Sequence, residues 1–202
     1  MTDASDLQGD DPVYTYKPSL MGAPWELRLT GDALTWRAGR QEGRVPYDRI
    51  VRVRLSFRPA TMQTRRFITE LWPAGGRRLS IPSTSWRSMV EQTPQDQAYG
   101  DFIRALHRRI ADAGGAASLE TGLPPVLYWP GLAVFAVVAL ALVALIVRAL
   151  GVGELAGAAF VGGFLGLLIW QSGTFFRRNR PGRYRPDALP PTLVPGDRPP
   201  QS

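Results

Sequence analysis

Two long stretches without a charged side chain constrain this chain more than any other feature. Residues 126–147 read "VLYWPGLAVFAVVALALVALIV" and residues 155–176 read "LAGAAFVGGFLGLLIWQSGTFF". Each has 22 residues, which as an α-helix extends about 33 Å, enough to cross a hydrocarbon layer of roughly 30 Å. A chain of 202 residues has little room to bury two such helices in a core of its own. We therefore expect a transmembrane helical hairpin over residues 126–176.

The charges around this hairpin predict its orientation. The connector, residues 148–154, is so short that both flanks should lie on one side of the membrane, and it offers only Arg148. Five arginines follow the second stretch: Arg177, Arg178, Arg180, Arg183 and Arg185. Because basic residues favour the cytoplasmic side, both termini should be cytoplasmic. The opening "MTDASDLQGD" has no apolar core typical of a secretory signal.

Small residues recur every four positions in the second stretch, at Ala158, Gly162 and Gly166. Such a row lets helix backbones approach closely. The row could pack against the first helix of the same hairpin or against a second copy of the chain, and the sequence leaves both interpretations open.

The segment before the hairpin alternates in the manner of β-strands. Residues 25–37 hold two alternating runs around "TGD", a turn signal, and residues 65–73 and 77–83 flank a second turn, "AGG". In "YDRIVRVRLSFRP", residues 47–59, one face should carry Val51, Val53, Leu55 and Phe57 inward, and the other should carry Arg52, Arg54 and Arg58. Several short strands with tight turns predict an antiparallel meander or barrel.

A helix should follow these strands. Thr93 is placed as its N-cap, Pro94 at its first position and Gly114 as its stop. One apolar stripe is expected to face the strands: Tyr99, Phe102, Ile103, Leu106 and Ile110. His107 lies one position past the stripe, so we expect it on the helix surface.

With "VPYDRIVRVRL", "LSIPS" and "FIRALHRRI", residues 20–115 resemble the bacterial pleckstrin-homology-like (PH-like) domain membrane proteins. The resemblance implies an α+β fold: a small antiparallel PH-like barrel or sandwich capped by a C-terminal amphipathic helix, followed by the hairpin. It implies a membrane location and no reaction. The remaining segments are expected to be a disordered N-terminus (1–19), a linker (116–125), and a basic, proline-rich cytoplasmic tail (177–202).

The composition argues against catalysis. The chain has no cysteine and one histidine, His107, which excludes thiolate chemistry and any site built on several histidines of one chain. It holds neither a glycine-rich phosphate loop followed by lysine nor a G-x-S-x-G motif. We expect no enzyme activity, no metal and no cofactor.

The arginines admit three interpretations: phosphoinositide-type headgroup binding, nucleic-acid binding, or a solvated face biased toward anionic lipid or an acidic partner. The short "TGD" turn speaks against the first, and a membrane tether speaks against the second. The candidate lipid or partner surface therefore comprises Arg52, Arg54, Arg58, Arg177, Arg178, Arg180, Arg183 and Arg185.

With the family resemblance, the sequence thus predicts a membrane-anchored, non-catalytic PH-like binding or scaffolding module at the cytoplasmic face of a bacterial inner membrane. Its expected partners are the lipid bilayer and a membrane protein or a second copy, with no nucleic acid. The alternative is an accessory subunit of a membrane transporter or of an envelope-enzyme complex.

Overall fold

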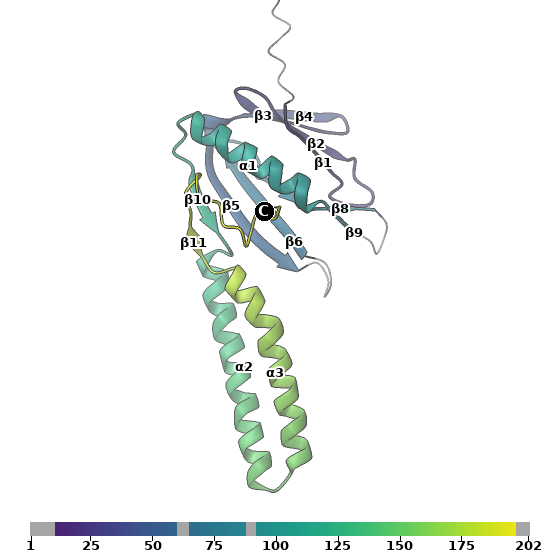
Figure 1. Cartoon of the computed structure of the whole chain (residues 1–202), viewed down its shortest axis with the longest axis vertical. Coiled ribbons are helices and arrows are strands. Elements are labelled where there is room, and N and C mark those ends of the chain that lie inside the picture. Colours follow the sequence, from purple (N-terminus) through teal and green to yellow (C-terminus); the bar gives the residue numbers. More distant parts are fainter. Residues whose placement is uncertain (1–10, 60–64, 88–91, 197–202) are drawn as a thin grey trace, which may run out of the picture. The chain divides into compact units, whose positions relative to one another are not determined.

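The computed structural model describes residues 11–59, 65–87 and 92–196. They form two compact units (Figure 1). The first, here called the sandwich unit, combines the chain up to Thr121 with the chain from Gly182 onward. The second, the hairpin unit, is Gly122–Pro181. The chain therefore leaves the first unit, forms the second, and returns to complete the first.

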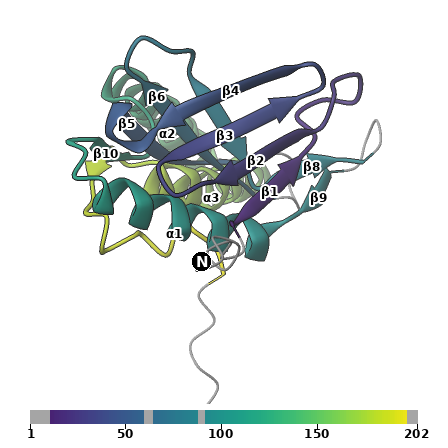
Figure 2. The ribbon, with the colours of Figure 1, turned by 90° about the horizontal axis from the view of Figure 1, so that it is seen from above.

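The sandwich unit contains two larger sheets and a small one. The first sheet has the order β1-β2-β3-β4, formed by Val13–Tyr16, Trp25–Leu29, Ala33–Ala38 and Gln41–Pro46. The second has the order β11-β10-β5-β6-β7, formed by Gly182–Arg183, Ser118–Thr121, Ile50–Pro59, Arg65–Pro73 and Leu79–Pro82. The third pairs β8 (Thr84–Trp86) with β9 (Gln92–Pro94). Figure 2 shows the strands of the first sheet side by side.

The architecture is α+β, with antiparallel pairing everywhere except between β10 and β5, which are parallel. Neither large sheet closes on itself in the described residues. Two strands lie in segments for which the sequence predicted no structure, because β1 falls within residues 1–19 and β10 within residues 116–125. Residues 88–91, between β8 and β9, lie outside the described residues.

The predicted turn at "TGD" is confirmed. Thr30 donates its backbone N–H to the carbonyl of Ala33 at 2.9 Å, and its hydroxyl donates to the same carbonyl at 2.8 Å. This closes the β2–β3 hairpin, whose partners include Leu27 opposite Trp36. Side-chain hydrogen bonds of this kind are why threonine favours turns.

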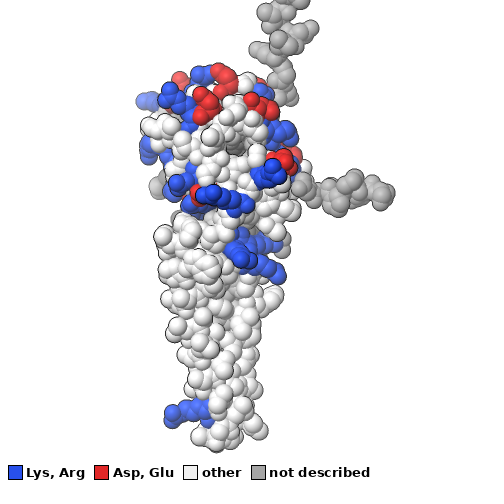
Figure 3. Space-filling model, turned by 90° about the vertical axis from the view of Figure 1, so that its left-hand side faces the viewer, with Lys and Arg blue, Asp and Glu red and all other residues white. Residues whose placement is uncertain are grey.

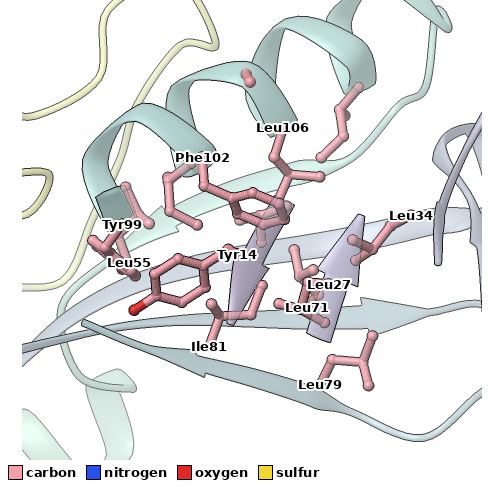
Figure 4. Packing of buried hydrophobic residues seen from close by; sticks show 14 of the residues in the cluster. Tyr14, Leu27, Leu34, Leu55, Leu71, Leu79, Ile81, Tyr99, Phe102 and Leu106 are labelled. Carbon is pink, nitrogen blue, oxygen red and sulfur yellow. The ribbon is translucent and has the colours of Figure 1, made fainter. Parts of the chain in front are cut away.

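One hydrophobic cluster lies between the two large sheets and α1, the helix Asp96–Asp112. Figure 4 shows Tyr99, Phe102 and Leu106 reaching from α1 toward the strand side chains. All five residues of the predicted stripe are buried. The amphipathic helix thus covers a sheet face that would otherwise expose leucines and isoleucines to water.

The predicted start of α1 is wrong, and its predicted end is confirmed. Thr93 and Pro94 belong to β9, and the residue before the helix is Gln95, which makes no side-chain capping bond. The stop is confirmed, since Gly114 follows the helix with φ +64°, a conformation that favours glycine.

The predicted inward face of β5 is confirmed at Val53, Leu55 and Phe57 and is wrong at Val51. Val51 is exposed, and Ile50 is buried in its place. The β5–β6 register shifts between Ile50 and Arg52. An irregularity of this kind reverses the alternation locally, so simple period-two reasoning misplaces the first residue of the strand.

The chain after the hairpin packs into the sandwich unit, where the sequence predicted a basic, proline-rich tail. We call residues 182–196 the strap. The strap begins as β11 on β10, and its Leu193 and Val194 are buried in the core cluster. The carbonyl of Pro195 accepts a hydrogen bond from Arg104 at 3.4 Å.

The hairpin unit consists of α2 (Pro125–Gly151) and α3 (Leu155–Arg178), a few residues longer than predicted. Both are long and apolar enough to cross a membrane. Among described residues of this unit, only a few, including Tyr128 and Ala158, are buried. Its surface is almost entirely uncharged in Figure 3, with basic side chains only near its ends.

Candidate functional site

The outer face of β5 carries the arginines that the sequence singled out, and the structure gives two of them a shared acidic partner. Arg54 donates from Nε and Nη2 to one carboxylate oxygen of Glu120, at 3.1 and 2.5 Å. Arg52 approaches the other oxygen at 3.5 Å. Glu120 is placed there by β10, which pairs with β5 so that Glu120 lies opposite Arg54.

An aromatic ring completes this cluster. Trp72 on β6 lies opposite Arg52, and the guanidinium carbons of Arg52 and Arg54 stand 5.4 and 5.2 Å from its ring centroid. Cations at this distance from an indole face are attracted by its quadrupole. Trp72 therefore has two cationic neighbours already in place.

The electrostatics of Glu120 follow from these neighbours. Partial burial opposes ionisation of its carboxyl, but the hydrogen bond and charge of Arg54 and the charge of Arg52 outweigh burial and lower the pKa of Glu120. The carboxylate therefore remains charged at neutral pH and neutralises part of the arginine face.

The far end of the same face is arranged differently. Glu70 is buried and receives Arg78 at 3.0 Å and Arg58 at 4.0 Å. Arg58 also lies directly opposite Arg66, and burial together with the charge of Arg58 lowers the pKa of Arg66. The facing of Arg58 and Arg66 is unfavourable, because like charges directly opposite each other on a strand pair repel.

The structure thus divides the predicted solvated face. The side chain of Arg54 is only 11% exposed, whereas those of Arg52 and Arg58 are 46% and 53% exposed. Arg54 serves the fold by joining β10 to β5. Arg52 and Arg58 remain accessible to an anionic surface.

The arginines after the hairpin fall into both units. Arg177 and Arg178 are in the last turn of α3, where positive charge favours the helix dipole, and Arg180 follows in the same unit. Arg183 lies in β11 and Arg185 shortly after it, both in the sandwich unit. The sequence grouped these five arginines by position, and the structure assigns them to two separate bodies.

The predicted helix-packing row is used only in part. Ala158 is buried, but a Cβ added at Gly162 or Gly166 would meet no atom within 4 Å. Within the described residues, these two glycines do not mediate close contact with α2.

One buried polar pair, His107 and Tyr184, was not predicted from the sequence. His107 was expected on the helix surface; this is wrong, since His107 is buried. Its Nδ1 lies 2.7 Å from the carbonyl of Ile103, and its Nε2 lies 2.7 Å from the hydroxyl of Tyr184. The carbonyl requires Nδ1 to donate, so Nε2 accepts from the tyrosine.

Burial sets the ionisation of this pair. Burial lowers the pKa of His107 to about 4, partly offset by its bond to Ile103, and burial raises the pKa of Tyr184. Both groups are neutral at pH 7. Tyr184 is separated from His107 by 77 positions along the chain, and no local pattern links the two residues.

The described ranges contain no group of three or more histidine, cysteine or acidic side chains that could hold a metal ion. The chain matches no protein-family model, no curated protein and no solved structure.

Proposed function

We propose that this chain is a membrane-anchored, non-catalytic binding or scaffolding module, with a PH-like sandwich at the cytoplasmic face of a bacterial inner membrane. The two apolar helices support the anchor, because their outward side chains would otherwise face water. The strands, turns and closing helix α1 support a PH-like sandwich. The accessible Arg52 and Arg58 support an affinity for anionic surfaces.

The observation that contributes most to the proposed topology is the return of the chain to the sandwich unit. Residues on both sides of the hairpin form one body, joined by the β10–β11 pairing of Glu120 with Arg183 and Thr121 with Gly182. A domain built from both flanks requires both flanks on one side of the membrane. The arginines near α3 favour the cytoplasmic side.

The hydrogen bonds of His107 support a non-catalytic function. Both ring nitrogens are engaged by the fold, so the ring offers no open nitrogen to a substrate. The proposed contribution of the module is binding.

The absence of cysteine makes the topology directly testable. Single-cysteine variants Arg108→Cys, Asp187→Cys and Val152→Cys place a thiol on exposed positions of α1, the strap and the hairpin turn. In cells with a permeabilised outer membrane, an impermeant maleimide should label only Val152→Cys. The other two should react only after the inner membrane is opened. Labelling of Asp187→Cys or Arg108→Cys in closed cells would contradict the proposed orientation.

A second candidate, an accessory subunit of a transporter or envelope-enzyme complex, is favoured by the open glycines of α3. Gly162 and Gly166 have free space around them, which a neighbouring helix could occupy at short range. Purification in mild detergent distinguishes the two candidates. A stoichiometric membrane protein that is lost on Gly162→Leu supports the subunit, and enrichment of lipid alone supports the surface module.

A further inference from the structure

A groove at one end of the sandwich unit is separate from the arginine face of β5. It has a volume of about 510 Å³ and is bounded by β4, the turn η1 (Tyr47–Arg49) and the turn between β6 and β7. Small-molecule sites commonly occupy about 300–1,000 Å³, so the groove has the size of a ligand site.

The groove is positioned by a backbone contact between its two turns. The N–H of Ala74 donates to the carbonyl of Arg49 at 2.7 Å, which ties the β6–β7 turn to η1. Gly75 and Gly76 add no side chains to this turn, and Gly75 has φ +72°. Arg49, which accepts this hydrogen bond, and Arg77, which follows the turn glycines, both border the groove.

The interior of the groove is apolar. Trp36 lies across Gly43, where an added Cβ would stand 2.6 Å from the indole. The ring also stacks on Trp25, with centroids 5.1 Å apart and planes inclined by 17°. Val45 and Leu79 continue this lining and belong to the core cluster. The fold thus holds an aromatic and aliphatic floor in place; the side chain of Trp36 is half-buried, whereas Val45 and Leu79 are 7% and 5% exposed.

The rim of the groove is basic. Arg44 borders it and is paired with Asp32, whereas Arg49 and Arg77 have no ion pair within the described residues. Both are exposed. An inorganic anion would pair with the arginines of the rim but leave the apolar floor exposed to water. A neutral hydrocarbon would cover the floor but leave the arginines without an anionic partner.

We propose that this groove binds a soluble single-chain anionic amphiphile, with a carboxylate or phosphate held by Arg49 and Arg77 and an alkyl chain lying on Trp36, Val45 and Leu79. The anionic group of such a ligand matches the basic rim, and its alkyl chain matches the apolar floor. This inference is independent of the membrane surface assigned to Arg52 and Arg58.

The test uses the full chain in phosphatidylcholine nanodiscs, titrated calorimetrically with ethyl, butyl and hexyl phosphate; empty discs correct for partitioning. Each methylene that is fully buried should raise the affinity up to about fourfold. Arg49→Gln and Arg77→Gln should each lower the affinity for hexyl phosphate about tenfold, since each removes a charge-assisted hydrogen bond. The matched control is Arg108→Gln, an exposed α1 arginine outside the groove, which should change the affinity less than twofold.

Several outcomes would overturn the proposal. Equal affinities for ethyl and hexyl phosphate would show that the alkyl chain does not contact the apolar floor. Equal affinities for hexyl glucoside and hexyl phosphate would show that the arginines of the rim do not bind the anionic group. An equal loss in Arg108→Gln would show a diffuse field of charge. Absence of saturable binding would exclude the site. Chain length probes the floor without mutating a core residue, so misfolding cannot imitate the result.

A further arm of the experiment identifies the source of the ligand. Phosphatidylglycerol replaces part of the phosphatidylcholine, and hexyl phosphate is titrated again. Unchanged affinity supports a soluble amphiphile. A competitive loss would overturn that source in favour of anionic lipid from the bilayer itself.

Discussion

Phe102 in the sandwich unit is 2% exposed, while Phe160 in the hairpin unit is 79% exposed. Each lies on an α-helix, and the difference comes from the pattern around it. Around Phe102 the apolar residues form one stripe beside charged residues, so α1 finds its partner within the chain. Around Phe160 they occupy all sides, so α3 needs an apolar environment that the described residues do not supply.

The glycines repeat this contrast. In α1, a Cβ on Gly100 would overlap the carbonyl oxygen of Pro195 in the strap. In α3, a Cβ on Gly162 would meet nothing within 4 Å. Glycine is structurally required at this position of the first unit, whereas Gly162 in the second unit has room for a side chain within the described residues. Matched substitutions in the two units can therefore test whether the units differ as described.

The phenylalanine pair should show the largest difference. Phe102→Ala should lower the free energy of unfolding of the sandwich unit by about 3–5 kcal/mol, because it leaves a cavity in the core. Phe160→Ala should leave that free energy unchanged within about 0.5 kcal/mol. Near-ultraviolet circular dichroism during thermal unfolding measures both. Similar losses in the two variants would show that the units are not energetically distinct.

Acid should act on the sandwich unit through His107. The folded pKa of about 4 lies below the ordinary value of 6.5, so the unfolded chain binds the proton first. The stabilising contribution is therefore complete above pH 6.5 and is lost as the pH falls from 6.5 toward 4, by roughly 2–4 kcal/mol. His107→Gln should remove most of this slope from a stability-against-pH curve, and an unchanged slope would assign it to other groups.

The glycine pair should differ in sign. Alanine has the higher helix propensity, by about 1 kcal/mol, so Gly162→Ala should be neutral or stabilising. Gly100→Ala should destabilise the sandwich unit by about 1–3 kcal/mol, because the added methyl displaces the strap. Protease cleavage within the strap should accelerate in Gly100→Ala and not in Gly162→Ala. Equal protection of the strap in both variants would contradict its packing against Gly100.

The glutamate pair should give the smallest difference. Glu120→Gln removes the charge between Arg52 and Arg54 and should cost about 1 kcal/mol at pH 7. Since the pKa of Glu120 is lowered below 4.5, this contribution is present above pH 4.5 and disappears at lower pH. Glu154→Gln, at an exposed position of the hairpin turn, should change little. A pH-independent gap between Glu120→Gln and the parent chain would refute this account.

Much of the sandwich unit follows from the sequence where interactions are local. The stripe of α1 and the turn at Thr30 are predicted because their determinants lie within a few residues of one another. Val51 is misplaced because a register shift depends on the partner strand β6, which the sequence of β5 does not reveal. Local pattern predicts an element well and its irregularities poorly.

In the candidate site, too, local pattern does not predict contacts between residues that are distant along the chain. The arginines of β5 are visible in the sequence, but their partner Glu120 lies 66 positions from Arg54 on a strand that no alternation marks. The strap has neither a helical nor a strand period, and its prolines are typical of disorder. Its order comes from α1 and β10, which are distant along the chain.

The return of the strap has a consequence for biosynthesis. Synthesis proceeds from the N-terminus, so α1 and every strand except β11 emerge before the strap exists, and their core lacks Leu193 and Val194 at that stage. In the proposed topology both hairpin helices must enter the membrane before the strap can reach Gly100 and His107. Correct insertion thereby becomes a precondition for a finished core, and a chain with a misplaced second helix keeps an unfinished domain that proteases can recognise.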